Sequence, residues 1–235
     1  MAWMLITVIP WGLALLLLST WIGRTPLWWF AVNWFRLVIW GSRVIVGIEV
    51  RVSGLENLPQ GEITPAILLA KHQSTLETLL LPTLMPHPLA FVFKRELLRI
   101  PFFGWSMARL DMIHIDRESR AASLKHVVAR GKVLLAQGTW IILFPEGTRM
   151  PRGEKGTYQT AGTRLAVETG APVVPIAVSS GKCWPRKRFI KHPGVVQVSI
   201  GKPIASVGRE PKALMREVEL WIEAEMRRID PEAYR

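Results

Sequence analysis

The chain has almost no cysteine and no grouping of residues typical of a metal site. Among its 235 residues only Cys183 is a cysteine, so no disulfide can form within the chain, which is compatible with a reducing compartment. Its neighbours, Lys182 and Trp184, supply no base that would activate a thiol nucleophile. The five histidines are scattered and none pairs with the cysteine, so we expect no metal site.

Acidic residues are also scarce. There are 18 acidic against 30 basic side chains, which gives a net charge of +12. Such a balance predicts acidic partners, and the candidates are nucleic acid, anionic lipid, a phosphorylated substrate, coenzyme A or an acidic acyl carrier protein. The length allows one sizeable core plus an extension. A hydrophobic content of 49% is high for a soluble domain.

Residues 3–22 contain no charged side chain, and Arg24 is the first. About twenty apolar residues suffice to cross a bilayer. The segment has neither the basic start nor the small-residue cleavage site of a signal peptide, so we expect a retained membrane helix. Basic residues follow it at Arg24, Arg36 and Arg43. The positive-inside rule then predicts that the remaining chain lies in the cytoplasm, at the cytoplasmic face of the inner membrane.

Seven of the eleven tryptophans lie in the first 41 residues. Residues 27–41 are rich in aromatic side chains but are interrupted by Asn33 and Arg36. Tryptophan prefers the membrane interface, which favours an interfacial helix or the second arm of a shallow hairpin. A buried helix of the globular core is the alternative. We therefore predict a membrane-associated helical segment over residues 1–41 and a catalytic domain over residues 42–235.

The remaining sequence alternates between strand and helix patterns. Strands are predicted at 44–52, 66–70, 89–93, 110–115, 140–144, 173–178 and 195–200. One helix is predicted from about residue 74 to an end within 82–88, and others are predicted at 119–137, 160–169 and 213–229. This alternation predicts an α/β fold with a largely parallel, mixed sheet flanked by helices, carrying the N-terminal hydrophobic membrane-associated segment.

His72 lies two residues after the apolar run at 66–70, at the junction between a strand and a helix. Ligands gather at that edge of α/β sheets. Glu77 lies five residues on, where its carboxylate can orient the imidazole and leave the second ring nitrogen as a base. Two other interpretations remain open. Ser74 and Glu77 have the spacing of a helix capping box, and His72 fits an ordinary turn histidine.

A second buried strand at 140–144 leads into the turn 145–149, in which Gly147 supplies an unusual backbone conformation. Together, the histidine with its acid and the sequence Phe-Pro-Glu-Gly-Thr-Arg at 144–149 resemble the glycerolipid acyltransferase family, whose best-known members acylate lysophosphatidic acid. Residues 93–104 and 173–178 resemble two further blocks of that family, in the same order. The resemblance covers roughly residues 45–205.

The chain departs from the family pattern at two positions. The family usually has aspartate where this chain has Glu77, and asparagine where it has Lys71. Glutamate is one methylene longer but can still accept a hydrogen bond from a ring nitrogen.

The resemblance implies roles for individual residues. His72 would act as general base with Glu77 as its orienting acid, and no covalent enzyme intermediate is needed. The implied substrate-binding residues are the cations Lys94, Arg95 and Arg149, for the acceptor phosphate, and the turn residues Glu146, Gly147 and Thr148. No cofactor is expected, because acyl-CoA or acyl carrier protein would serve as co-substrate.

The resulting functional prediction is an acyltransferase that moves a fatty acyl group from acyl-CoA or acyl carrier protein to the free hydroxyl of lysophosphatidic acid, forming phosphatidic acid in phospholipid biosynthesis. One alternative is an acyltransferase for another lysolipid acceptor. Another is a non-enzymatic basic protein that binds membrane surfaces or nucleic acid. The basic and aromatic stretch 184–191 would suit such binding. That alternative explains neither Glu77 nor residues 144–149. We expect membrane lipid, a lysophospholipid and the acyl donor as partners, and no nucleic acid.

Overall fold

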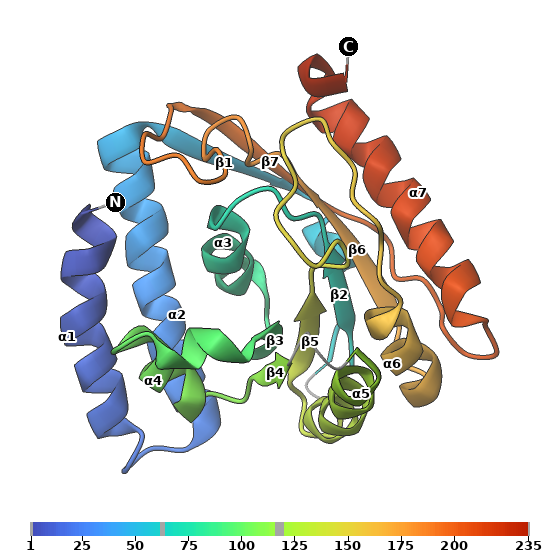
Figure 1. Cartoon of the computed structure of the whole chain (residues 1–235), viewed down its shortest axis with the longest axis horizontal. Coiled ribbons are helices and arrows are strands. Elements are labelled where there is room, and N and C mark those ends of the chain that lie inside the picture. Colours follow the sequence, from blue (N-terminus) through green and yellow to red (C-terminus); the bar gives the residue numbers. More distant parts are fainter. Residues whose placement is uncertain (1, 62–63, 116–119, 235) are drawn as a thin grey trace.

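The computed structural model describes residues 2–61, 64–115 and 120–234, and these form one sheet with helices on both faces (Figure 1). Within this part of the chain the sheet has seven strands in the order β1-β7-β6-β2-β5-β3-β4. The strands are β1 (Ile48–Ser53), β2 (Ile67–Ala70), β3 (Leu89–Lys94), β4 (Ile113–Ile115), β5 (Trp140–Leu143), β6 (Val173–Val178) and β7 (Gly194–Ile200). All neighbouring strands are parallel except β6 and β7. The predicted α/β fold and mostly parallel sheet are confirmed.

Helices cover the sheet on two sides (Figure 1). They are α1 (Ala2–Leu18), α2 (Arg24–Gly41), α3 (Leu76–Leu84), α4 (Phe103–Arg109), α5 (Arg120–Ala136), α6 (Ala161–Thr169) and α7 (Pro211–Ile229). Strand β2 shows why both faces are covered, because its side chains alternate between two cores. Leu68 and Ala70 join the core beneath α2 and α3, while Ile67 and Leu69 join the core beneath α5, α6 and α7. A strand that is buried on both faces has an uninterrupted run of apolar residues in its sequence.

Helices α1 and α2 form an antiparallel hairpin (Figure 1). The rings of Trp3 and Trp40 are 6.3 Å apart, and those of Trp11 and Phe30 are 5.1 Å apart. One side of α2, including Trp28, is buried in the core that α3 shares. Helix α2 is therefore the second arm of a hairpin. It is also a buried helix of the core, which was the alternative prediction for residues 27–41. The division of the chain at residues 41 and 42 stays a prediction.

The hairpin differs from the single long helix expected over residues 3–22. Helix α1 has 17 residues and ends at Leu18. At 1.5 Å per residue that is about 25 Å, less than the roughly 30 Å of a bilayer core. A polar turn at Ser19 and Thr20, followed by Gly23, sends the chain back into α2. In the described part of the chain, no helix has the length and apolar character needed to cross a membrane.

Helix α3 ends at Leu84, within residues 82–88, where its end was predicted. Helix α4 was not predicted, and it packs between the hairpin and the rest of the domain (Figure 1). The expected start of the 119–137 helix falls within 116–119, outside the described residues, and α5 is described from Arg120.

Strands β6, β2, β5 and β3 lie side by side and point the same way, so their carboxyl ends meet at one edge of the sheet. The segments at this edge are 71–75 after β2, 144–150 after β5, 179–181 after β6 and 94–95 at the end of β3. Every candidate site residue predicted above, apart from Glu77 in the first turn of α3, belongs to one of these segments.

Candidate active site

His72 is held between two of these segments. Its ring stacks on that of Phe144, with centroids 3.9 Å apart and planes 16° apart. Its main-chain N–H donates to Glu146 Oε2 at 3.1 Å, and its carbonyl accepts from the N–H of Met150 at 2.7 Å. The side chain is 14% exposed. The histidine is therefore fixed from both sides while part of its ring remains open to a substrate.

The imidazole of His72 faces Glu77. Its Nδ1 lies 3.6 Å from Glu77 Oε2, is buried and has no hydrogen-bond partner. This separation is slightly beyond hydrogen-bond length, but such bonds between catalytic groups often tighten only when substrate binds. Because Nδ1 faces the carboxylate, Nε2 is the nitrogen left to take a proton.

Glu77 also anchors the turn before α3. Its buried carboxylate accepts the N–H of Gln73 at 3.0 Å and that of Ser74 at 2.9 Å, together with the hydroxyls of Ser74 and Ser180. The capping-box interpretation and the orienting interpretation therefore describe one side chain at once. The same carboxylate closes the turn that carries His72 and faces the ring.

Lys71, directly before His72, forms a buried ion-pair network that reaches the last helix. Its Nζ lies 2.7 Å from Glu146 Oε1 and 2.7 Å from Glu223 Oε1, on α7. The hydroxyl of Tyr158 donates to Glu223 at 2.9 Å. Burial, and then the charges of Glu146 and Glu223, raise the pKa of Tyr158 far above its ordinary range, so it serves as a neutral donor.

Glu146 is consequently an inward-facing residue. Its carboxylate is buried and binds Lys71, the main chain of His72 and the N–H of Gly156. These contacts join the 144–150 segment to the His72 turn and to α7. The structure thus places Glu146 below the turn, where it holds the turn's shape.

The rest of this turn faces outward. Gly147 has φ +66°, and its N–H donates to the carbonyl of Phe144 at 2.9 Å. A Cβ there would meet no atom within 4 Å, so the left-handed backbone, not a lack of space, favours glycine. Gly147 and Thr148 are exposed, whereas Arg149 is half-buried and donates from its guanidinium to Thr75 Oγ1 at 2.8 Å.

A second cation lies close to Arg149. Burial and the nearby charge of Arg149 both lower the pKa of Lys191, in the loop before β7. Lys191 Nζ also lies 5.0 Å from the centroid of the Trp184 ring. Among the described residues, neither Arg149 nor Lys191 has an acidic partner within ion-pair distance. Two cations whose charges act on each other, and that have no acidic partner among the described residues, favour binding of an anion.

Lys94 and Arg95 are exposed at the end of β3, which is separated from β2 by β5. They share the edge of the sheet with His72, but no described hydrogen bond or ion pair joins them to the other predicted residues. The charge of Arg95 acts instead on His114, whose pKa is lowered mainly by burial, then by His126 and Arg95.

Sequence reasoning missed three residues that the fold brings to the site. Ser180 follows β6 and donates to Glu77, and Thr75 accepts from Arg149. Lys191 was noted only as part of a basic stretch. The signal that would have found Ser180 is its position just beyond a buried strand parallel to β2.

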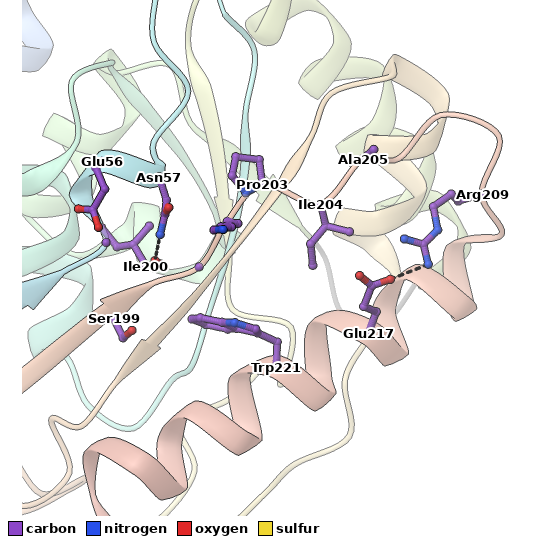
Figure 2. Close-up of a pocket in the computed structure, with 13 residues that line it drawn as sticks. Glu56, Asn57, Ser199, Ile200, Pro203, Ile204, Ala205, Arg209, Glu217 and Trp221 are labelled. Atoms are coloured by element: carbon purple, nitrogen blue, oxygen red, sulfur yellow. Dashed lines mark hydrogen bonds and ion pairs between the residues drawn. The ribbon is translucent and has the colours of Figure 1, made fainter.

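A cavity of about 800 Å³ lies at the opposite edge of the sheet (Figure 2). It is bordered by the end of β7 and by α7, with Trp221 facing into it. Two of its charged side chains, Arg209 and Glu217, are paired with each other at 2.7 Å. None of the predicted site residues lines this cavity.

Comparison with known proteins defines the class of the molecule. Residues 49–179 match the family model for acyltransferases, a range that contains all eight predicted site residues. The chain therefore belongs to this acyltransferase family.

Individual relatives agree with this assignment. The chain is 44% identical over 202 residues to the 1-acyl-sn-glycerol-3-phosphate acyltransferase of Pseudomonas aeruginosa, covering 85% of this chain and 77% of that one. It is 34% identical over 72% of its length to a chloroplastic enzyme of the same name from Arabidopsis thaliana, of which the match spans 48%. The crystal structure of the 1-acyl-sn-glycerophosphate acyltransferase PlsC from Thermotoga maritima superimposes with a TM-score of 0.76, covering 94% of this chain and 89% of that one at 25% identity.

Proposed function

We propose that the protein acylates lysophosphatidic acid, transferring a fatty acyl group from acyl-CoA or acyl carrier protein to its free hydroxyl and releasing phosphatidic acid. The observation that carries the proposal is the placement of His72 against Glu77 at the sheet edge, beside the turn that presents Arg149. The 44% identity to an enzyme named for this reaction supports it.

In the proposed reaction His72 is the general base. A hydroxyl is a poor nucleophile at neutral pH, and a positioned base contributes about 10²–10⁴-fold. Nε2 of His72 takes the hydroxyl proton as the oxygen attacks the thioester carbonyl, and returns it to the thiolate that leaves. Glu77 holds the ring and stabilises the imidazolium while it exists. No group on the protein becomes acylated, and no cofactor takes part.

The acceptor phosphate binds at the outer side of the 144–149 turn in this proposal. Arg149 supplies a fork of donors suited to phosphate oxygens, and Gly147 and Thr148 form the exposed wall beside it. Lys94 and Arg95 add positive charge from the end of β3. Glu146 contributes indirectly, because its buried carboxylate sets the shape of the turn.

We also propose that residues 1–41 hold the enzyme on the cytoplasmic face of a membrane by lying in one leaflet. The hairpin carries large apolar side chains that are exposed to solvent in this structure, among them Leu5, Ile6, Leu17, Trp21 and Trp40. Exposed apolar and tryptophan side chains on paired helices suit the interface of a bilayer. Deleting residues 1–41 should release much of the protein from membranes.

The experiment that tests the function offers a panel of lysophospholipids to the purified protein in detergent, with acyl-CoA and acyl carrier protein as alternative donors. Phosphatidic acid formed from lysophosphatidic acid, and lost in His72→Ala, is the expected result. His87→Ala is a matched control, because His87 also stacks on an aromatic ring, that of Trp140, at the other end of the strands. Preference for another lysolipid would replace the acceptor, and no acylated product from any pair would overturn the function.

A further inference from the structure

The loop between β6 and β7 exposes apolar and basic side chains together. Phe189 is 75% exposed and Ile190 is 68% exposed, although they are adjacent and large. The basic residues around them in the sequence are Arg186, Lys187, Arg188 and Lys191. We call residues 184–191 the basic loop. Only Lys191 of this loop has a place in the site described above.

The base of the basic loop is fixed while its tip projects. Trp184 is 5% exposed, and its N–H donates to the carbonyl of Ser180 at 2.8 Å. Across the loop, the N–H of His192 donates to the carbonyl of Cys183 at 2.9 Å. Lys187 holds φ +58°, an uncommon conformation for a residue with a side chain. A well-anchored loop thus holds Phe189 and Ile190 away from the core.

The basic loop also adjoins the end of the N-terminal hairpin (Figure 1). The N–H of Gly194 donates to the carbonyl of Gly47 at 3.1 Å, directly after the helical turn at 42–46 that continues α2. That turn exposes Val44 at 63% and Ile45 at 66%, beside the basic Arg43. Two segments far apart in the sequence therefore present the same combination of side chains side by side.

We propose that the basic loop is a second membrane contact, in which Phe189 and Ile190 enter the interface of a bilayer and the surrounding cations bind anionic lipid headgroups. Apolar side chains rimmed by lysine and arginine are suited to this interface, and each such cation adds electrostatic attraction to anionic lipid. A nucleic acid could stack a base on Phe189, but it would leave the aliphatic side chain of Ile190 in water. An acidic carrier protein would be attracted by the charge but would leave the apolar tip unexplained.

The placement has a consequence for the active site. Lys191, at the end of the basic loop, is close enough to Arg149 for the two charges to interact. A bilayer seated on Phe189 and Ile190 would therefore bring lipid headgroups to the outer side of the 144–149 turn. The inference does not depend on the proposed reaction, because the experiment that tests it measures contact of the basic loop with lipid and does not measure turnover.

The test uses a polarity-sensitive fluorophore on a single introduced cysteine in the full-length protein. Cys183 is fully buried, and burial raises the pKa of its thiol, so labelling of the unmodified chain serves as the background. The label is placed at Phe189→Cys and, as a matched control, at Leu220→Cys on α7, where the side chain is 62% exposed. Vesicles contain phosphatidylcholine with or without phosphatidylglycerol.

With anionic vesicles we expect a blue shift, and quenching by spin-labelled lipid, at position 189 but not at position 220. No response at position 189 when the protein is bound to vesicles would overturn the proposal, as would a failure to bind them. A response to acidic carrier protein in place of vesicles would assign the loop to that partner and also overturn it.

A second measurement does not rely on labelling. The double variant Phe189→Ser/Ile190→Ser should bind anionic vesicles about tenfold more weakly than wild type, since two apolar side chains no longer leave water. Leu220→Ser should bind like wild type. Thermal melts of both variants check that folding is kept. Equal vesicle affinity in the double variant and the control would contradict a contact through the basic loop.

Discussion

The two sides of the 144–149 turn use charge in opposite ways. On the inner side, Glu146 is buried and binds Lys71, which in turn binds Glu223. On the outer side, Arg149 contacts only a hydroxyl in the described structure, that of Thr75, and lies near a second cation, Lys191. Glu146 and Arg149 are three residues apart in one short motif, yet one faces the core and the other faces the position proposed for the substrate.

The inner side of the turn therefore sets the geometry of the site, whereas the outer side is proposed to bind the acceptor. A buried ion pair contributes little net stability, but removal of one partner leaves an uncompensated charge, so the inner network resists change. Neighbouring cations without acidic partners carry an unfavourable interaction until an anion arrives. We expect variants on the inner side to affect folding and those on the outer side to affect the affinity for the acceptor, with His72 and Glu77 between them governing turnover.

The largest effect is expected from His72→Ala. Loss of the proposed base should lower kcat by about 10²–10⁴-fold, measured with purified enzyme at saturating substrate. The fold should be kept, because the ring's described contact is stacking on Phe144 and the main-chain bonds to Glu146 and Met150 survive. Near-native turnover in a folded variant would remove His72 from the mechanism.

Glu77→Gln should combine a kinetic loss with a structural one. Loss of an orienting carboxylate in such a pair costs up to about 10⁴-fold in turnover. The amide nitrogen would also face the N–H groups of Gln73 and Ser74, so we expect the free energy of unfolding to fall by about 1–3 kcal/mol. Glu77→Asp should keep more activity, because it keeps the charge.

Ser180→Ala separates these two effects, because it removes one donor to Glu77 and leaves the carboxylate in place. Stability should fall slightly in this variant, and turnover should fall far less than in Glu77→Gln. Wild-type turnover in the glutamine variant would leave His72 to act alone.

Lys71→Met tests the inner network. It would leave Glu146 and Glu223 buried without their cation, at a cost of about 3–5 kcal/mol, seen as a lower midpoint of urea unfolding. The double variant Lys71→Met/Glu223→Gln should regain part of that loss, since one of the two charges is gone. If Lys71→Met unfolds like wild type, the network does not hold the turn.

The sequence was most informative where the pattern of a single strand or turn is enough to identify a structural element. Apolar runs identified β2, β5 and β6, and their parallel arrangement placed His72 and Arg149 at one edge. The length of α1 could not be read from hydropathy, because its end depends on the polar turn at Ser19 and on packing of α2 against it. Helix α4 was missed because it is only seven residues long.

Contacts between segments that are distant in the chain could not be predicted from the sequence. Buried Glu146 shares its cation, Lys71, with Glu223, which lies on a helix outside the matched family range. Ser180 reaches Glu77 only because β6 lies next to β2. The assigned roles of the eight site residues stay predictions until the variants are measured.

Arg149→Ala should act on the outer side alone. Loss of a charged hydrogen-bonding partner for phosphate corresponds to about 1.5–3 kcal/mol, or roughly 10–150-fold in the apparent KM for the lysolipid. The KM for the acyl donor and the urea midpoint should change little. A rise confined to the donor KM would reassign Arg149 to the coenzyme or carrier.

Lys191→Ala should have the smallest effect and is the sharpest test of the outer side. Lys191 lies near Arg149 and against the Trp184 ring, but it has no acidic partner among the described residues, so folding should change by less than about 0.5 kcal/mol. If the two cations share the phosphate, the lysolipid KM in detergent micelles should rise about two- to fivefold, and the rise should shrink at high salt. The double variant with Arg149→Ala should then lose less than the sum of the two single effects, because without Arg149 the phosphate is already held weakly and Lys191 contributes less to its binding. Strict additivity would mean that the two cations act independently and do not share the phosphate. A KM unchanged at low salt would leave Arg149 as the only phosphate ligand of the pair and confine Lys191 to the surface proposed for the bilayer.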